Sequence, residues 1–158
     1  VSIFALAYTG LLASFVSLML TSSHGAQRVV TVIVLTVASD IGGYAAGVLA
    51  GRHPMAPNIS PKKSWEGFAG SIILQSVVGV GLFFWWWHAP WWQGLITGIV
   101  MTITATAGDF IESAIKRDLG VKDMSHLLPG HGGLLDRLDS VLPNAFTGWL
   151  LLRTYLGP

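Results

Sequence analysis

The chain has 158 residues, of which 52% are hydrophobic and only 11% are charged, and its mean hydropathy is +0.61. Soluble domains carry about 25% charged residues, so the composition excludes an ordinary water-facing surface, and it also excludes intrinsic disorder, which needs high charge. The net charge of +1 gives no general attraction to nucleic acid, and the absence of cysteine excludes disulfides and thiolate metal sites.

Uncharged apolar segments long enough to cross a bilayer recur along the chain, since a crossing takes about 20 residues. They predict an all-α fold, a polytopic membrane helix bundle in which 1–158 form a single transmembrane domain. About five transmembrane helices are expected, at 1–20, 29–50, 68–87, 91–115 and a shorter one at 141–156.

The charged residues gather in two motif islands, at 40–67 and 108–140. The loops after the second and fourth spans hold seven of the nine basic residues: Arg52, Lys62, Lys63, Lys116, Arg117, Lys122 and Arg137. Because basic loops stay on the cytoplasmic side, both islands are expected to face the cytoplasm from a multi-pass protein of the cell (inner) membrane. The tryptophan-rich turn at 85–92 then faces outward as an interfacial aromatic belt.

Asp40 lies near the middle of the second span, where a carboxylate costs roughly 2.5–3.5 kcal/mol on insertion scales. A cavity, a cation or a metal should therefore compensate its charge. Gly43, Gly47 and Gly51 follow on the same helix face. Such small residues also serve helix packing, either within one chain or between two copies.

Ser60 and Pro61 predict a helix start, with serine as the N-cap and proline at the first helical position. Lys62 and Lys63 would then lie in the first turn, where they oppose the helix dipole unless an anion binds there. A phosphate group would explain their placement, although two cytoplasmic lysines also follow from the positive-inside rule alone.

The second island contains two acidic patterns with helical spacing. Asp109, Glu112, Ser113 and Lys116 share one helix face. Asp136 and Asp139 follow the glycine-flanked His131, in a stretch where the backbone can approach a ligand closely. Hard oxygen ligands without cysteine or a histidine pair favour Mg²⁺ over zinc, and the interleaved basic residues suit a polyphosphate. A solvated charged helix would explain only Asp118, Lys122 and Asp123.

The second island resembles the signature of the phosphatidate cytidylyltransferases (CDP-diacylglycerol synthases). The matching residues are Ser113-x-x-Lys116-Arg117-x4-Lys122-Asp123 and then Leu128-Pro129-Gly130-His131-Gly132-Gly133-x-x-Asp136-Arg137-x-Asp139. Residues 60–67 are similar to a second block of the family. Members of that family are nearly twice as long, so the chain is expected to be a C-terminal catalytic portion that lacks N-terminal spans.

The resemblance implies transfer of CMP from CTP to phosphatidic acid at the bilayer, giving CDP-diacylglycerol and pyrophosphate with Mg²⁺ or another hard divalent cation. Apart from the resemblance, the acid cluster is compatible with a further monovalent cation, and the small-residue stripe is compatible with a homodimer. The implied metal ligands are Asp40, Asp109, Asp136 and Asp139. The implied catalytic residues are Asp109, Lys116, His131, Asp136 and Asp139, and the implied substrate-binding residues are Ser60, Lys62, Lys63, Ser113, Arg117, Gly132, Gly133 and Arg137.

Three other functions fit parts of the sequence. A membrane CTP-dependent lipid kinase, acting on a polyprenol or phytol, would transfer the γ-phosphoryl group and release CDP. An ion or solute transporter would explain an acid inside a span, but it predicts polar residues spread over several spans. A noncatalytic scaffold leaves both islands unexplained.

Overall fold

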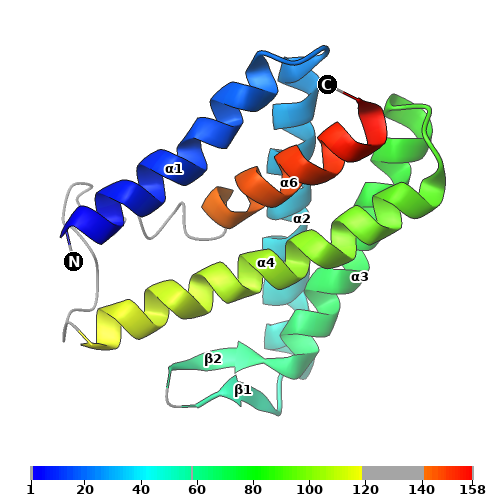
Figure 1. Cartoon of the computed structure of the whole chain (residues 1–158). Helices are drawn as coiled ribbons and strands as arrows, with labels where there is room; N and C mark the ends of the chain where they lie inside the picture. The colour runs from blue at the N-terminus through cyan, green and yellow to red at the C-terminus, as the bar shows by residue number, and fades with distance from the viewer. Residues whose placement is uncertain (1, 58, 119–140, 158) are drawn as a thin grey trace, which may run out of the picture.

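The computed structural model describes residues 2–57, 59–118 and 141–157. In these ranges the chain is almost entirely helical, which confirms the expected all-α class (Figure 1). The elements are α1 (Ser2–Leu20), α2 (Gly25–Ala50), β1 (Pro54–Ala56), β2 (Ser60–Ser64), α3 (Trp65–Gly81), the π-helical turn η1 (Leu82–Trp86), α4 (Trp91–Asp118) and α6 (Val141–Leu156).

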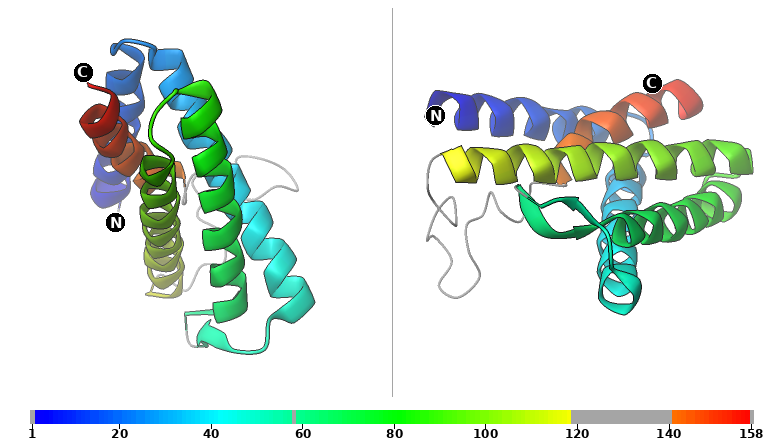
Figure 2. Two further views of the ribbon diagram at one scale, coloured as in Figure 1. Left: turned by 90° about the vertical axis from the view of Figure 1, so that its right-hand side faces the viewer. Right: turned by 90° about the horizontal axis from the view of Figure 1, so that it is seen from below.

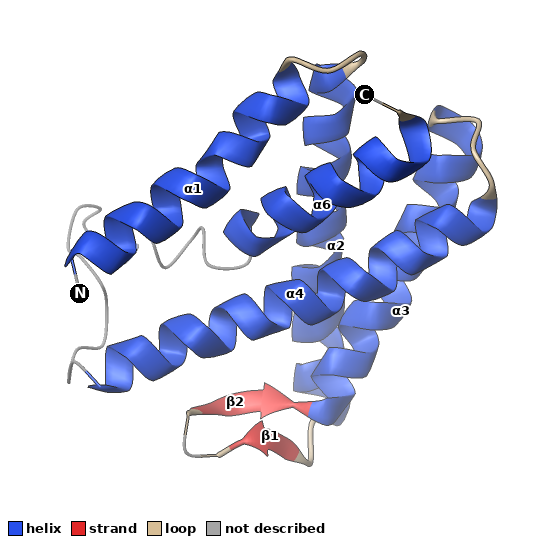
Figure 3. Cartoon of the chain, viewed as in Figure 1, coloured by secondary structure: helices blue, strands red, loops and turns tan. Residues whose placement is uncertain are grey.

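The helices form one bundle with a small hairpin at one end. Helices α2 and α3 pack along each other, α4 packs on α3, and α6 lies between α1 and α4 (Figure 2). Figure 3 shows β1 and β2 at the end of the bundle where α3 begins. Met19, Leu35, Phe83, Met101 and Leu152 are fully buried where these helices meet, and they form the apolar core.

Among the described residues, three helices are long and apolar enough to cross a membrane: Gly25–Ala50, Trp65–Trp86 and Trp91–Arg117. Their outward-facing apolar side chains, such as Ile33 and Ile73, suit contact with lipid. Helix α6 is 16 residues long, and the total of five spans stays a prediction. At the expected aromatic belt Trp85 and Trp91 are exposed, whereas Trp87 turns inward and its Nε1 donates a 3.0 Å hydrogen bond to Thr31 Oγ1.

Helices α2 and α3 approach each other through small residues. A Cβ atom on Gly42 would lie 2.5 Å from the carbonyl oxygen of Gly70, and one on Gly70 would lie 2.3 Å from Ala46 Cβ. The neighbouring Gly43 also packs on α3, because a Cβ there would lie 2.5 Å from Ser71 Oγ. The glycine face of α2 therefore serves packing within the chain, and the homodimer stays a prediction.

We expect Gly42→Ala to destabilise the protein by about 1–3 kcal/mol, because the added methyl group meets backbone that has to shift. The measurement is chemical unfolding in detergent micelles, followed by circular dichroism. Gly10→Ala is the matched control, since a Cβ on Gly10 meets nothing within 4 Å and alanine favours a helix over glycine. If Gly42→Ala were as stable as wild type or more stable, the crossing of α2 and α3 would tolerate a wider separation of the two helices.

The predicted helix start at Ser60 was wrong. Residues Ser60–Ser64 form β2, which pairs antiparallel with β1, Ala56 opposite Ser60 and Pro54 opposite Ser64. Helix α3 starts at Trp65, and its N-cap is Ser64, whose Oγ accepts a 3.1 Å hydrogen bond from the Gly67 amide. The strand pairing and this second serine cap outweigh the Ser-Pro signal, so Lys63 lies in a strand just before the helix and not in its first turn.

Candidate active site

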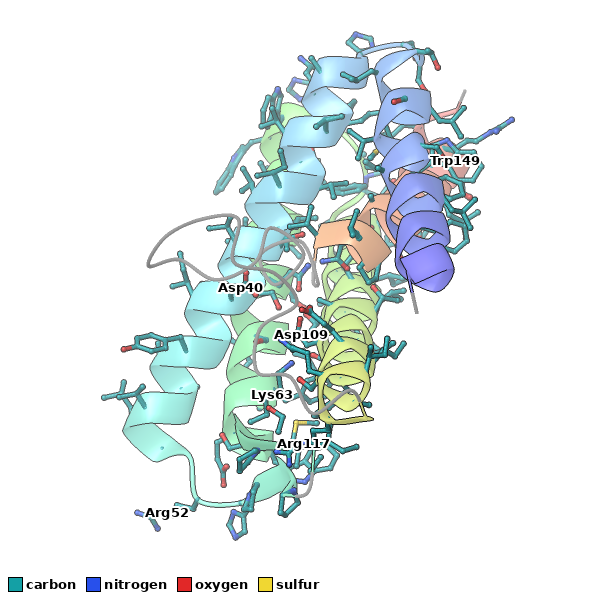
Figure 4. All side chains as sticks on the ribbon, turned by 90° about the vertical axis from the view of Figure 1, so that its left-hand side faces the viewer. Asp40, Arg52, Lys63, Asp109, Arg117 and Trp149 are labelled. Atoms are coloured by element: carbon teal, nitrogen blue, oxygen red, sulfur yellow. The ribbon has the colours of Figure 1, made fainter. Side chains whose placement is uncertain are left out.

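A pocket of about 260 Å³ lies between α2, α3, α4 and the hairpin. Its charged lining residues are Asp40 from α2, Lys63 from β2 and Asp109 from α4. Figure 4 shows these three side chains along the space between α2 and α4. The pocket also has hydroxyl groups on its walls, from Ser39, Ser64, Ser71 and Thr106.

Asp40 has the polar surroundings that its position in an apolar helix requires. It lines the pocket, and so do Gly43 and Gly47 one and two turns further along α2. Because Gly47 carries no side chain and a Cβ there would meet no atom closer than 3.8 Å, the wall beside it leaves space for a ligand. Asp40 therefore lines a cavity, one of the three means of compensation expected from the sequence, and compensation by a cation or a metal stays a prediction.

Lys63 and Asp109 form an ion pair that joins the two motif islands. The Lys63 ammonium group is in direct contact with Asp109 Oδ2, and the two side chains are 27% and 24% exposed. The same ammonium group lies 4.9 Å from the centroid of the Phe110 ring, at cation–π distance. The pocket thus holds Lys63 through two neighbouring residues of α4.

The remaining described residues of the predicted site lie further along α4 or in the hairpin. Lys116 pairs with the buried Glu112 at 3.2 Å, one helical turn away, and Arg117 Nε donates a 2.6 Å hydrogen bond to the Ile59 carbonyl oxygen. This last contact fastens the hairpin to the end of α4. Four predicted residues are not in the described lining of the pocket, and their substrate roles stay predictions: Ser60, Ser113, Lys116 and Arg117.

Sequence reasoning missed Glu66, which fixes the hairpin that carries Lys63. Glu66 Oε2 accepts hydrogen bonds of 3.2 Å from the backbone amides of Arg52 and His53, and Oε1 lies 2.5 Å from His53 Nδ1. The end of the α2–β1 connection is thereby tied to the first turn of α3. The available signal was an acid in the first turn of a helix, where the dipole favours it.

Several predicted site residues lie outside the described residues. They are His131, Gly132, Gly133, Asp136, Arg137 and Asp139, and of Lys62 only the backbone is described. Two of the four predicted metal ligands, Asp40 and Asp109, share the pocket. Within 2–57, 59–118 and 141–157 there is no cluster of three or more His, Asp or Glu. Two carboxylates with nearby hydroxyl groups fit Mg²⁺, which commonly takes one or two carboxylates together with substrate phosphates.

Comparisons with known proteins agree with the resemblance noted in the sequence. The model of the cytidylyltransferase family matches residues 1–155. A phosphatidate cytidylyltransferase of Mycobacterium leprae is 48% identical over 151 residues, which cover 96% of this chain and 48% of the relative. A protein of the same name from Staphylococcus haemolyticus is 39% identical, over 87% of this chain and 53% of the relative. The chain spans about half the length of these curated relatives.

Proposed function

Because this chain belongs to the cytidylyltransferase family, we propose that it carries the catalytic site of a phosphatidate cytidylyltransferase. In this reaction CMP passes from CTP to phosphatidic acid, giving CDP-diacylglycerol and pyrophosphate. The observation that carries the proposal is the pocket in which Lys63 of the first island and Asp109 of the second meet beside Asp40. A pocket with acids and a base among apolar helices suits a substrate with a charged headgroup and a lipid tail.

The proposed reaction is an in-line displacement at the α-phosphorus of CTP. A phosphate oxygen of phosphatidic acid forms the new P–O bond, the bond to the bridging oxygen of the β-phosphate breaks, and pyrophosphate leaves with that electron pair. The second pKa of a phosphomonoester is near 6, so the attacking group is largely a dianion at neutral pH and needs little help from a base. The protein has to supply positioning and charge neutralisation.

Asp40 and Asp109 would hold a divalent cation, with Asp136 and Asp139 as further proposed ligands. The cation supplies charge neutralisation at the phosphates. Lys63 lies in the same pocket, in direct contact with Asp109, and we assign it to a phosphate oxygen of the triphosphate. His131, Arg137 and the Gly132–Gly133 amides are proposed phosphate contacts.

The orientation follows from the basic loops. The hairpin and the end of α4 carry four of the nine basic residues, Lys62, Lys63, Lys116 and Arg117, and we place them on the cytoplasmic side of the inner membrane. The aromatic turn between η1 and α4 lies at the opposite end of α3 and would face the outer interface.

The test is pyrophosphate release from CTP by the full chain with phosphatidic acid and Mg²⁺, with EDTA as the control. We expect metal-dependent pyrophosphate and a CDP-lipid product in equal amounts. Release of CDP would instead identify a lipid kinase. Absence of nucleotide turnover both from this chain and from a longer chain with N-terminal spans would refute the nucleotidyl transfer and favour a transporter.

A further inference from the structure

We infer that Lys63 is a tethered counterion that competes with the divalent cation for Asp109, so that the metal binds firmly only together with the nucleotide. This inference deepens the proposed function and rests on it. Its basis is the direct contact between the Lys63 ammonium group and Asp109 Oδ2, inside the pocket that also holds Asp40.

The competition follows from the geometry of the ion pair. A dication that binds Asp109 shares its carboxylate with the ammonium group of Lys63 or displaces it. Two positive charges a few ångströms apart repel each other strongly in a partly buried site. Both partners of the pair are about three-quarters buried, so solvent screens this repulsion less than it would at the surface.

Lys63 has a second contact that keeps it in the pocket after it leaves Asp109. Its ammonium group lies 4.9 Å from the Phe110 ring centroid, and Phe110 follows Asp109 directly. The hairpin that carries Lys63 is held at one end by Glu66 and at the other by Arg117. The lysine can therefore change partner by a side-chain movement alone, from the carboxylate to a phosphate oxygen.

The charges in the pocket explain why a bound nucleotide should increase the affinity of the site for the metal. The described lining includes two acids, Asp40 and Asp109, and one base, Lys63. A dication that binds Asp109 without a nucleotide adds positive charge beside the Lys63 ammonium group and repels it. A bound triphosphate offers acceptors to both cations at once, so metal and nucleotide are expected to strengthen each other's binding.

The experiment measures Mn²⁺ binding to the full chain in lipid nanodiscs, without turnover, from the electron paramagnetic resonance signal of free Mn²⁺. Lys63→Met should bind Mn²⁺ alone about tenfold more tightly than wild type, because the competing charge is gone. Lys63→Arg keeps the charge and should bind like wild type. The matched control is Arg52→Met, which removes an exposed charge outside the described lining of the pocket, and it should also bind like wild type.

A second series repeats the titration with a non-hydrolysable CTP analogue. In wild type the analogue should increase Mn²⁺ affinity, and in Lys63→Met this increase should be markedly smaller. A purely structural role for Lys63 would instead weaken Mn²⁺ binding in both series.

The inference fails if Lys63→Met binds Mn²⁺ alone no more tightly than wild type. It also fails if Asp109→Asn leaves Mn²⁺ affinity unchanged, because no competition then takes place at Asp109. Neither result tests the proposed function. That function is tested by pyrophosphate release from CTP by the wild-type chain.

Discussion

Asp109→Asn should reduce pyrophosphate release by about a thousandfold or more, because the pocket loses a carboxylate ligand for the metal that neutralises the phosphates. The substitution keeps the shape of the side chain and removes its charge. The measurement is the steady-state rate with CTP and phosphatidic acid at saturating Mg²⁺.

Folding should hardly change in this variant. The Lys63–Asp109 pair is about three-quarters buried, but the asparagine that replaces Asp109 still offers an amide oxygen as a hydrogen-bond acceptor for the Lys63 ammonium group. The helical circular dichroism and the unfolding midpoint of Asp109→Asn should therefore stay close to those of wild type. The loss of turnover would then reflect a slower catalytic step and not a loss of folded protein.

The matched control is Asp118→Asn at the last residue of the same helix. The sequence pattern assigns Asp118 to a solvated face, and we expect its variant to keep most of its activity. A rate for Asp109→Asn within about tenfold of wild type would be too small a loss for a metal ligand, and it would contradict the assignment.

Most of the helical framework could be predicted from sequence because a bilayer leaves the backbone few alternatives. Because the hydrocarbon core holds no water, backbone N–H and C=O groups there must hydrogen-bond to each other within the segment, and long apolar segments therefore form helices. The spans at 29–50, 68–87 and 91–115 accordingly match α2, α3 with η1, and α4 to within a few residues. The observed α4 continues to Asp118, because its polar end still follows helical spacing.

The hairpin could not be predicted because its structure depends on partners distant in sequence. Ser60 and Ser64 are both acceptable N-caps, and the local pattern favours Ser60 because a proline follows it. The choice is made by the pairing of β2 with β1 and by the Glu66 contacts to the backbone of Arg52 and His53. These contacts bring together residues that no local periodicity connects.

Three of the predicted site residues, Asp40, Lys63 and Asp109, line the pocket, but the contacts between them could not be predicted. Asp40 was identifiable from the cost of an acid in an apolar span, and Asp109 from its spacing to Glu112. The pairing of Lys63 with Asp109 spans 46 positions, and it depends on a strand that the sequence pattern assigned to a helix. The glycines of α2 were ambiguous because small residues serve packing and pocket walls alike. Gly42 packs against Gly70 and Gly47 lines the pocket, so both uses occur on one helix.

Asn144→Ala should lower the free energy of unfolding by about 2 kcal/mol, because hydrogen bonds between membrane helices contribute about 0.6 to 1.7 kcal/mol each and truncation also leaves a cavity. Asn144 is fully buried at the start of α6. Its Nδ2 donates a 2.9 Å hydrogen bond to Thr36 Oγ1 of α2, and its Oδ1 accepts one of 2.9 Å from Thr104 Oγ1 of α4.

One amide side chain thus joins α6 to the two helices that carry Asp40 and Asp109. Helix α6 also begins at Val141, directly after the second motif island in sequence. We therefore expect Asn144→Ala to reduce turnover as well as stability, through the position of α6 relative to the pocket. Chemical unfolding in micelles and the pyrophosphate assay, run on the same preparation, measure both effects.

Thr154→Ala is the matched control on α6. Thr154 is exposed, and its Oγ1 donates only to the Leu150 carbonyl oxygen within the same helix, so its loss should change stability by no more than about 0.5 kcal/mol. If Asn144→Ala proves as stable as Thr154→Ala, the three helices are held by apolar packing alone. The amide then contributes nothing to the position of α6.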